Sequence, residues 1–411
     1  MSIRHHTADG TFVAAASDLP RIRKLGTDVI MLLPIYPIGE VNRRGALGHP
    51  TAVRDHKIID PTMGATDDFN NFVSAVHDNG MLLVLDMVLA VSAVDSTIAV
   101  ERPEWFYKRD GELFNRVTQR SDAVDFDYTH TDMWDYQLDI IKFWDDKADG
   151  FRFTTASLIP MEFWRKARAA TPDAIFVADT LEPAIITQYR NEGYYAASDG
   201  ELFEVFDICY DSDILRYFDA YLNKYIPLAV YTSLLELQEA IYPSQYCKLR
   251  FLETPYRRRI KSFMRDNSML RSWTAFCYMQ KGAVMINAGQ EHSAVATPAL
   301  TEPESVDFRS GQDLTRLLRR LYKLKKDPLL SHGSFYMTPD EKNDIITYRY
   351  ILGERWLEGS FSLKGINGIA DTHVPDGEYL NLLDYSTVRV MHGKYGVDSN
   401  SVLFCSDLKA V

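Results

Sequence analysis

Short apolar runs alternate along most of the chain with longer stretches whose apolar residues repeat at helical spacing. The short runs are rich in Val, Ile, Leu and Phe and lack strict alternation, which is typical of parallel strands buried on both faces. Strands and helices in alternation predict βαβ units and a parallel sheet. The expected strands lie at residues 1–5, 28–35, 81–89, 150–153, 174–178, 205–209, 249–252 and 283–287. These eight candidates match the strand number of a closed (β/α)8 TIM barrel.

Three of the intervening segments have clear helical signals. The segment 67–79 begins with acidic residues and stops at Gly80, which is the order expected of a helix start and end. The segment 131–147 repeats aromatic and aliphatic residues at helical spacing, and 312–326 ends in a basic cluster that suits a helix C-terminus. We therefore expect helices at these three places.

The pattern changes after Pro328 to short runs separated by Gly, Asn and Asp. The runs lie at 345–352, 355–363, 379–383 and 401–405, and they predict short antiparallel strands. The expected architecture is an α/β (β/α)8 TIM barrel at 1–330, with a short excursion at about 91–125. A small, sandwich-like C-terminal antiparallel β domain is expected to follow at 331–411.

Composition limits the partners that the chain can have. The 411 residues carry a formal net charge of -12, and a polyanion repels phosphate backbones, so nucleic acid is not an expected partner. Since no apolar run reaches the ~20 residues of a bilayer crossing, no membrane span is expected. The first residues lack the pattern of a signal peptide, and the four cysteines lack metal-ligand spacing. We therefore expect a cytoplasmic protein with buried thiols.

A series of distinctive segments follows the predicted strands. They are PIYPIGE at 34–40 with RRGALG at 43–48, LDMVLAV at 85–91, DGFRFTTA at 149–156, FVAD at 176–179, RFLETPY at 250–256 and AGQE at 288–291. In order and spacing they resemble the motifs of the α-amylase family, glycoside hydrolase family 13. Each lies at the C-terminal end of a strand, where barrel enzymes place their active sites. The resemblance implies a retaining glycosidase that acts on α-glucosidic bonds.

The resemblance also assigns family roles to residues that are altered in this chain. The nucleophile position falls on Thr154, the general acid/base on Asp179 and the third acid on Tyr256. The two sugar-contacting histidines fall on Val91 and Pro255. The reactive positions of the family therefore carry different residues here.

Two further substitutions concern sugar stacking and metal binding. The aromatic residue that usually stacks on the sugar falls on Thr51, and the Asn that often ligates a structural calcium falls on Ala90. We therefore expect neither calcium nor another metal, and no cofactor.

Residues of the family framework are retained. Asp86 and Arg152 resemble the paired Asp and Arg beneath the nucleophile, and they are expected to form an ion pair. Glu253, Gln290 and Glu291 are retained as well. The positions expected to contact a ligand at the barrel mouth are Asp86, Arg152, Thr51, Val91 and Glu253.

The substitutions predict a loss of catalysis, because retaining hydrolysis needs two carboxylates about 5–5.5 Å apart. The hydroxyl of Thr154 is a weak nucleophile without an adjacent general base. Asp179 is one methylene shorter than Glu, which withdraws the proton by about 1 Å. Tyr256 carries no charge near neutral pH, since the pKa of an unperturbed tyrosine is about 10. We predict a pseudoenzyme that binds α-glucan or an oligosaccharide at the barrel mouth.

Other hypotheses remain open at this stage. One is an interaction or regulatory subunit that binds a protein partner and whose cleft is plugged by Tyr256 and Arg257. Another is a residually active α-glucan hydrolase or transferase that uses a displaced carboxylate, with Asp199, Glu201 and Glu253 as candidates. Since Thr154 leaves Arg152 facing an uncharged position, an anionic ligand at Arg152 is a further hypothesis. The acidic stretch 122–127 is interpreted as a solvated loop.

Overall fold

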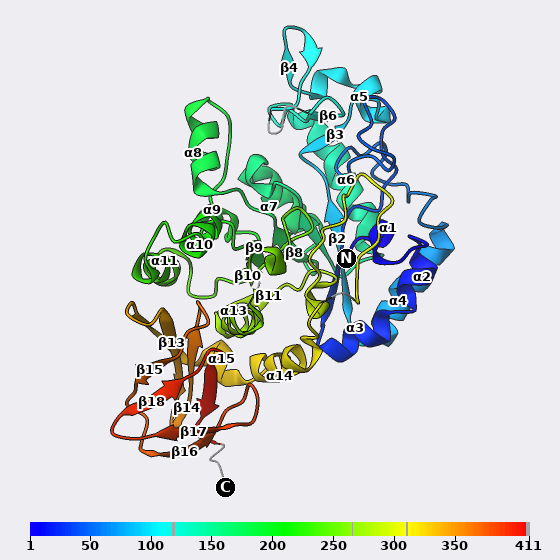
Figure 1. Cartoon of the computed structure of the whole chain (residues 1–411). Helices are drawn as coiled ribbons and strands as arrows, with labels where there is room; N and C mark the ends of the chain where they lie inside the picture. Colours follow the sequence, from blue (N-terminus) through cyan, green and yellow to red (C-terminus); the bar gives the residue numbers. More distant parts are fainter. Residues whose placement is uncertain (117–119, 265, 310, 408–411) are drawn as a thin grey trace. The chain divides into compact units, whose positions relative to one another are not determined.

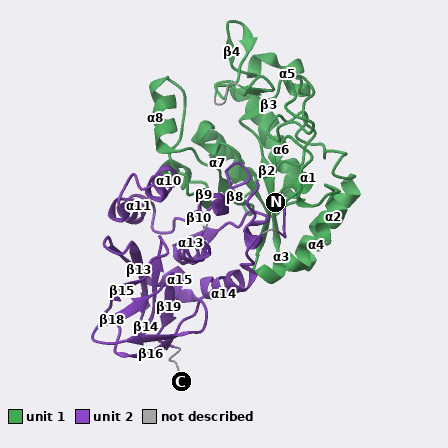
Figure 2. Ribbon diagram, in the orientation of Figure 1, with its two compact units in different colours: residues 1–213, 297–306 green, residues 214–296, 307–411 purple. Residues whose placement is uncertain are grey.

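The computed structural model describes residues 1–116, 120–264, 266–309 and 311–407 (Figure 1). The chain divides into two compact units, shown in different colours in Figure 2. The first unit comprises Met1–Asp213 and Thr297–Val306, and the second comprises Ile214–Ala296 and Asp307–Val411. Each unit is described separately below.

Parallel strands form the centre of the first unit. They are β1 (Val29–Leu32), β2 (Leu82–Met87), β7 (Gly150–Phe153), β8 (Ile175–Ala178) and β9 (Ile208–Tyr210), hydrogen-bonded in this order. The register of β2 against β7 pairs Asp86 with Arg152. The strand geometry alone therefore sets these two residues beside each other, one residue from the C-terminal end of β2.

Helices connect the strands of the first unit, and a small excursion follows β2. The helices are α1 (Ile3–His6), α2 (Phe12–Ala16), α3 (Leu19–Leu25), α4 (Thr66–Asp78), α5 (Thr97–Glu101), α6 (Trp134–Asp145), α7 (Met161–Ala170), α8 (Pro183–Asn191) and α9 (Asp199–Leu202). Single 3-10 turns form η1 (Pro103–Trp105), η2 (Thr131–Met133) and η3 (Ala156–Leu158). The excursion contains two antiparallel pairs, β3 (Val91–Ala93) with β6 (Ala123–Asp125), and β4 (Lys108–Arg109) with β5 (Glu112–Leu113).

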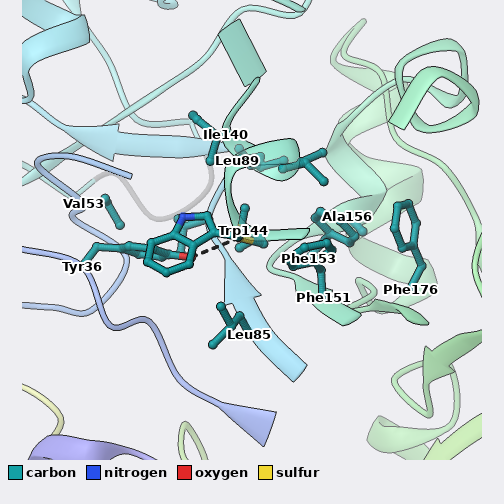
Figure 3. Close-up of a cluster of buried hydrophobic side chains, with 14 of the residues drawn as sticks. Tyr36, Val53, Leu85, Leu89, Ile140, Trp144, Phe151, Phe153, Ala156 and Phe176 are labelled. Atoms are coloured by element: carbon teal, nitrogen blue, oxygen red, sulfur yellow. Dashed lines mark hydrogen bonds between the residues drawn. The ribbon is translucent and has the colours of Figure 1, made fainter. Parts of the chain in front are cut away.

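Aromatic and aliphatic side chains from the strands and from α6 and α7 form the core of the first unit. Figure 3 shows Tyr36 beside Trp144, with ring centroids 5.7 Å apart, and Phe153 beside Phe176, 4.9 Å apart. The dashed line in Figure 3 marks the contact of the Tyr36 hydroxyl with Met87 Sδ at 3.0 Å. Burial on this scale fixes the ends of β2 and β7 and hence the polar residues that they carry.

The second unit begins with helices and two short parallel strands. The strands are β10 (Lys248–Arg250) and β11 (Ala283–Val284), which pair with each other. The helices are α10 (Leu215–Leu222), α11 (Leu228–Ile241), α12 (Ile260–Phe263), α13 (Asn267–Met279), α14 (Thr315–Lys325) and α15 (Pro328–His332), with a 3-10 turn at η4 (Gln290–His292).

The rest of the second unit is antiparallel. One four-stranded sheet has the order β12 (Ser334–Asp340), β13 (Ile345–Leu352), β14 (Arg355–Ser362) and β19 (Val402–Cys405). Two antiparallel pairs accompany it, β15 (Gly368–Asp371) with β18 (Lys394–Val397), and β16 (Gly377–Leu380) with β17 (Thr387–Val390). This part corresponds to the predicted C-terminal β domain, and the parallel strands with their helices correspond to the predicted (β/α)8 barrel. The fold class is therefore confirmed.

The first expected strand, at 1–5, is wrong, since the chain forms helix α1 there. Arg4, His5 and His6 explain the difference, because three consecutive polar residues cannot line a strand that is buried on both faces. Each side chain finds a polar partner instead: Arg4 pairs with Asp60, His5 lies 3.2 Å from the Glu302 carbonyl, and His6 lies 2.8 Å from Asp18.

The expected strand at 205–209 lies slightly later in the chain, at β9. Val205 and Phe206 close the end of α9, where the Phe206 N–H donates to the Leu202 carbonyl at 2.9 Å.

None of the described helices combines the length and apolarity that a bilayer crossing requires.

Candidate active site

Arg152 on β7 is the centre of a buried polar cluster. Its Nη1 donates to Asp86 Oδ2 and, at 2.9 Å, to Thr154 Oγ1. Its Nη2 donates to Asp179 Oδ2 at 2.8 Å, and its Nε donates to the Tyr210 hydroxyl at 2.9 Å. These residues, here called the Arg152 cluster, lie at or just after the ends of β2, β7, β8 and β9. The predicted ion pair of Asp86 with Arg152 is confirmed.

Asp86 is the most buried acid of the cluster, with no exposed side-chain surface. Its Oδ1 accepts a hydrogen bond from Thr154 Oγ1 at 2.7 Å, while its Oδ2 accepts from Arg152, so both oxygens have donors. Burial raises the pKa of Asp86 to about 6, against the opposing effects of Arg152 and Thr154. Asp86 thus accepts from both neighbours and fixes the position of the Thr154 hydroxyl.

The charges of the cluster do not suit an anionic ligand. One guanidinium faces two carboxylates, Asp86 and Asp179, so the cluster carries a net negative charge. Burial raises the pKa of Tyr210 well above its usual value, which keeps that hydroxyl neutral. These charges argue against an anionic ligand at Arg152, because two carboxylates already accept from its guanidinium.

Exposure decides which of these groups a ligand could touch. Asp179 has 25% of its side chain exposed, whereas Thr154 is 9% exposed and Asp86 is fully covered. The accessible side of the cluster therefore offers a single carboxylate, already hydrogen-bonded to Arg152.

Thr51 and Val91 are held by other partners in the first unit. Thr51 is buried, and its Oγ1 lies 2.9 Å from His49 Nδ1 and accepts from Arg120 Nη1 at 2.7 Å. Val91 is also buried and pairs with Asp125 in the register of β3 and β6. The contacts of these two residues are thus with the excursion.

The acidic stretch 122–127 is not a solvated loop. Asp122 and Asp125 are buried, and they pair with Arg120 at 2.8 Å and Arg116 at 3.0 Å. Burial raises the pKa of Asp125, while Arg116 lowers it. The interpretation from sequence failed because each acid is neutralised by an arginine upstream in the same excursion.

Glu253 and Tyr256 belong to the second unit. Glu253 Oε1 accepts from Arg259 Nη1 at 2.7 Å, and its Oε2 accepts from the Ile260 N–H at 2.7 Å. Burial raises the pKa of Glu253, and Arg259 lowers it. Glu253 is thus a buried partner of Arg259, with 1% of its side chain exposed.

Tyr256 differs in that 42% of it is exposed. Its neighbour Arg257 pairs with Asp219 of α10 at 2.6 Å, so Arg257 is held by a local ion pair. Pro255, at the second histidine position, is half-buried.

Asp199 and Glu201 were the other candidates for a displaced carboxylate. Glu201 Oε2 accepts from the Ser198 N–H and from Arg190, both at 2.7 Å, which caps helix α9. Asp199 is buried at the first turn of the same short helix. Glu201 therefore has a structural role.

Three residues that contact Arg152, Asp86 or Thr51 were not predicted from the sequence: Tyr210, Tyr36 and Arg120. The hydroxyl of Tyr36 donates to the Asp86 carbonyl at 3.1 Å and so contacts the backbone of β2. Tyr210 ends β9, and the rule that active sites lie at strand C-termini would have found it had that strand been bounded correctly. Arg120 belongs to no recognisable motif.

Across residues 1–116, 120–264, 266–309 and 311–407, no three His, Cys, Asp or Glu side chains converge as metal ligands. Ala90 is buried, and its carbonyl accepts from the Phe126 N–H at 3.1 Å.

Comparison with known proteins connects this geometry to a family. Residues 5–99 match the family described as the α-amylase catalytic domain, and residues 336–404 match the bacterial α-amylase C-terminal domain. An α-amylase from Lactobacillus plantarum is 35% identical in sequence, with a TM-score of 0.95 over 99% of this chain and 97% of that chain. The chain belongs to the α-amylase family.

Two further relatives match this α-amylase-family chain over very different fractions of its length. A noncanonic maltogenic α-amylase from Thermotoga neapolitana is 26% identical, with a TM-score of 0.86 over 100% of this chain and 98% of that chain. An α-1,4-glucan:maltose-1-phosphate maltosyltransferase from Mycobacterium tuberculosis is 32% identical over 199 residues. That match covers 42% of this chain and only 28% of the transferase.

Proposed function

We propose that the protein binds α-glucan chains or oligosaccharides without hydrolysing them. The observation that carries the proposal is the state of the nucleophile position, where the Thr154 hydroxyl donates to Asp86 and accepts from Arg152. The carboxylate that a retaining glycosidase needs there is absent, and the nearest one, Asp86, is fully covered. The names of the related α-amylases and maltosyltransferases support an α-glucan as the ligand class.

A neutral glucan suits the Arg152 cluster better than a sugar phosphate does. The related transferase is named for maltose 1-phosphate, whose phosphate is an anion. Here the cluster carries two carboxylates and one guanidinium, so a phosphate placed beside it would meet like charge. We therefore propose that neutral maltooligosaccharides bind and that their phosphorylated forms bind less tightly.

A second candidate function is residual hydrolysis or glucanotransfer. It is favoured by one observation, namely that Thr154 Oγ1 donates to a carboxylate whose pKa is raised to about 6, which places a base beside the hydroxyl. Arg152 opposes this chemistry, because its hydrogen bonds hold both Asp86 and Asp179 in their present positions. A substrate would also have to reach a hydroxyl that is 9% exposed.

Paired binding and activity measurements test the proposed function. Isothermal titration calorimetry with maltoheptaose is expected to give saturable binding, while starch and nitrophenyl α-glucosides are expected to yield no product above a blank. Asp179→Ala is expected to weaken binding, whereas Asp207→Ala, which removes an exposed carboxylate paired with Arg168, serves as the matched control. Turnover above the blank that Asp179→Ala abolishes would establish the second candidate, and absence of binding would refute the first.

We also propose that the protein needs no calcium and acts in the cytoplasm. Ala90 offers no side-chain oxygen at the family's calcium-ligand position. A ligand that binds only the folded state raises its melting temperature by mass action. Adding a chelator is therefore expected to change the melting temperature by less than about 1 °C, as followed by circular dichroism. A fall of several degrees would show that a bound metal stabilises the fold.

A further inference from the structure

A buried ion pair connects the excursion to the loop that carries Thr51. Arg120 Nε and Nη2 donate to the two oxygens of Asp122, each at 2.8 Å. Arg120 Nη1 donates to Thr51 Oγ1 at 2.7 Å and to His49 Nδ1 at 2.8 Å. The Arg120 side chain is 10% exposed, and that of Asp122 is 3% exposed. All three nitrogens of the guanidinium are thus used within the protein, which fixes its position.

The ionisation of His49 agrees with this arrangement. Burial and the charge of Arg120 lower the pKa of His49 to about 4, so the ring is neutral at neutral pH. A neutral imidazole can accept a hydrogen bond at Nδ1, whereas a protonated one cannot. A second contact, from Asn42 Nδ2 to the Ser121 carbonyl at 2.8 Å, holds the neighbouring residue. Residues 120–122, here called the strap, are therefore fastened to the 42–51 loop at two points.

The strap lies at the same end of β2 as the Arg152 cluster. Val53, two residues after Thr51, accepts hydrogen bonds at its carbonyl from Ser92 Oγ at 3.0 Å and from the Ala93 N–H at 2.9 Å. Those residues belong to β3, which begins four residues after β2 ends. Figure 3 shows Val53 near Tyr36, whose hydroxyl donates to the Asp86 carbonyl.

We propose that Arg120 is a specificity-determining residue that closes the position at Thr51 to sugar rings. The inference rests on the proposed function, and on Thr51 standing where the family presents an aromatic ring. The threonine side chain is smaller than such a ring, and its hydroxyl accepts a hydrogen bond from the Arg120 guanidinium, whose charge Asp122 neutralises. Bound glucan is therefore held by hydrogen bonds at the rim of the Arg152 cluster, without ring stacking at this position.

Opening the strap and restoring a ring tests the inference. Arg120 and Asp122 are removed together as Arg120→Ser/Asp122→Asn, because a single change would leave a buried charge unpaired. Thr51→Tyr alone is expected to change the dissociation constant for maltoheptaose by less than about twofold, since the guanidinium leaves the ring no space. The triple variant is expected to bind about tenfold more tightly, which equals ~1.4 kcal/mol and is within the range of ring stacking.

Labelling of His49 by diethyl pyrocarbonate reports closure without any glucan. Peptide mass spectrometry is expected to find His49 protected in the wild type and labelled in Arg120→Ser/Asp122→Asn, with exposed His373 as the internal reference. If the double variant does not fold, Arg120→Lys replaces it. Lysine keeps the charge but cannot make the bidentate contact with Asp122, so intermediate labelling is expected.

The possible outcomes separate this inference from the proposed function. Tighter binding by the triple variant supports the inference, whether or not the wild type binds measurably. Wild-type binding that the triple variant leaves unchanged or weakens overturns it, while the proposed function stands. If no variant binds glucan, the proposed function fails, and the specificity role fails with it. In that case the labelling experiment tests only whether Arg120 and Asp122 cover His49. Rapid labelling of His49 in the wild type would refute this covering as well.

Discussion

Thr154→Asp is expected to yield no measurable hydrolysis of a chromogenic α-glucoside. The new carboxylate would enter a site where Arg152 already holds Asp86 and Asp179, so three acids would share one guanidinium. Repulsion among them raises the pKa of at least one acid and favours a neutral form, which is a poor nucleophile. Since catalytic groups act as a unit, a single repair recovers little, and the rate is expected to stay at least about a thousandfold below that of ordinary enzymes.

A reversion series locates what else is missing. Thr154→Asp, Asp179→Glu and Tyr256→Asp are assayed singly and in all combinations, with Thr155→Asp as the neighbouring control. Thr155 lies next to the nucleophile position, but its hydroxyl donates to the Thr154 carbonyl and not to the Arg152 cluster. Hydrolysis by Thr154→Asp alone at about 1 s⁻¹ or faster, within the usual enzyme range, would contradict a broadly dismantled site.

Asp86→Asn is expected to lower the free energy of unfolding by about 3–5 kcal/mol, the usual cost of breaking a buried ion pair from one side. The amide of asparagine has one acceptor oxygen, whereas Asp86 accepts from both Thr154 and Arg152. One of these buried donors would therefore lose its partner. Urea unfolding followed by fluorescence measures the change in the free energy of unfolding. The slope of this free energy against urea concentration should be the same for the variant and the wild type.

Two comparisons show whether the lost ion pair causes this effect. Asp179→Asn removes the other carboxylate from the same guanidinium, but at a partly exposed position, and is expected to cost less than about 1 kcal/mol. The double variant Asp86→Leu/Arg152→Met is expected to cost less than the sum of its single changes. It leaves no fully buried charge of the pair behind, and Asp179, which also loses Arg152, is partly exposed. An Asp86→Asn protein within about 1 kcal/mol of the wild type would show that Arg152 does not depend on this partner.

The pairing of Asp86 with Arg152 could be predicted because the motifs that carry these residues resemble those of the α-amylase family, in which the matching Asp and Arg are paired. The apolar pattern placed β13 at its observed bounds, since its apolar residues are flanked by clear turn signals. The local pattern of apolar residues is sufficient to predict a strand that packs against a single hydrophobic core. It failed at 1–5, where consecutive polar residues find individual partners and the chain turns into a helix.

The strap could not be predicted from the sequence. Asp122 and Asp125 are acidic residues in a polar stretch, and such residues are exposed in most proteins. Their burial depends on Arg116 and Arg120, whose contacts are set by the folding of the excursion onto the 42–51 loop. No periodicity encodes this contact, because it joins two irregular segments. Arg120 accordingly emerges only from the three-dimensional structure.

The register of β2 and β7 gives Asp86 and Arg152 a role in strand alignment that is independent of sugar chemistry. They are direct partners across two parallel strands. Sliding one strand by a single residue would send Arg152 to the opposite face of the sheet and leave Asp86 charged and enclosed without it. A misaligned pairing would therefore incur the cost of a buried lone charge, so the ion pair selects one alignment while the barrel assembles. An ion pair at the candidate active site can in this way also act as a checkpoint for correct folding.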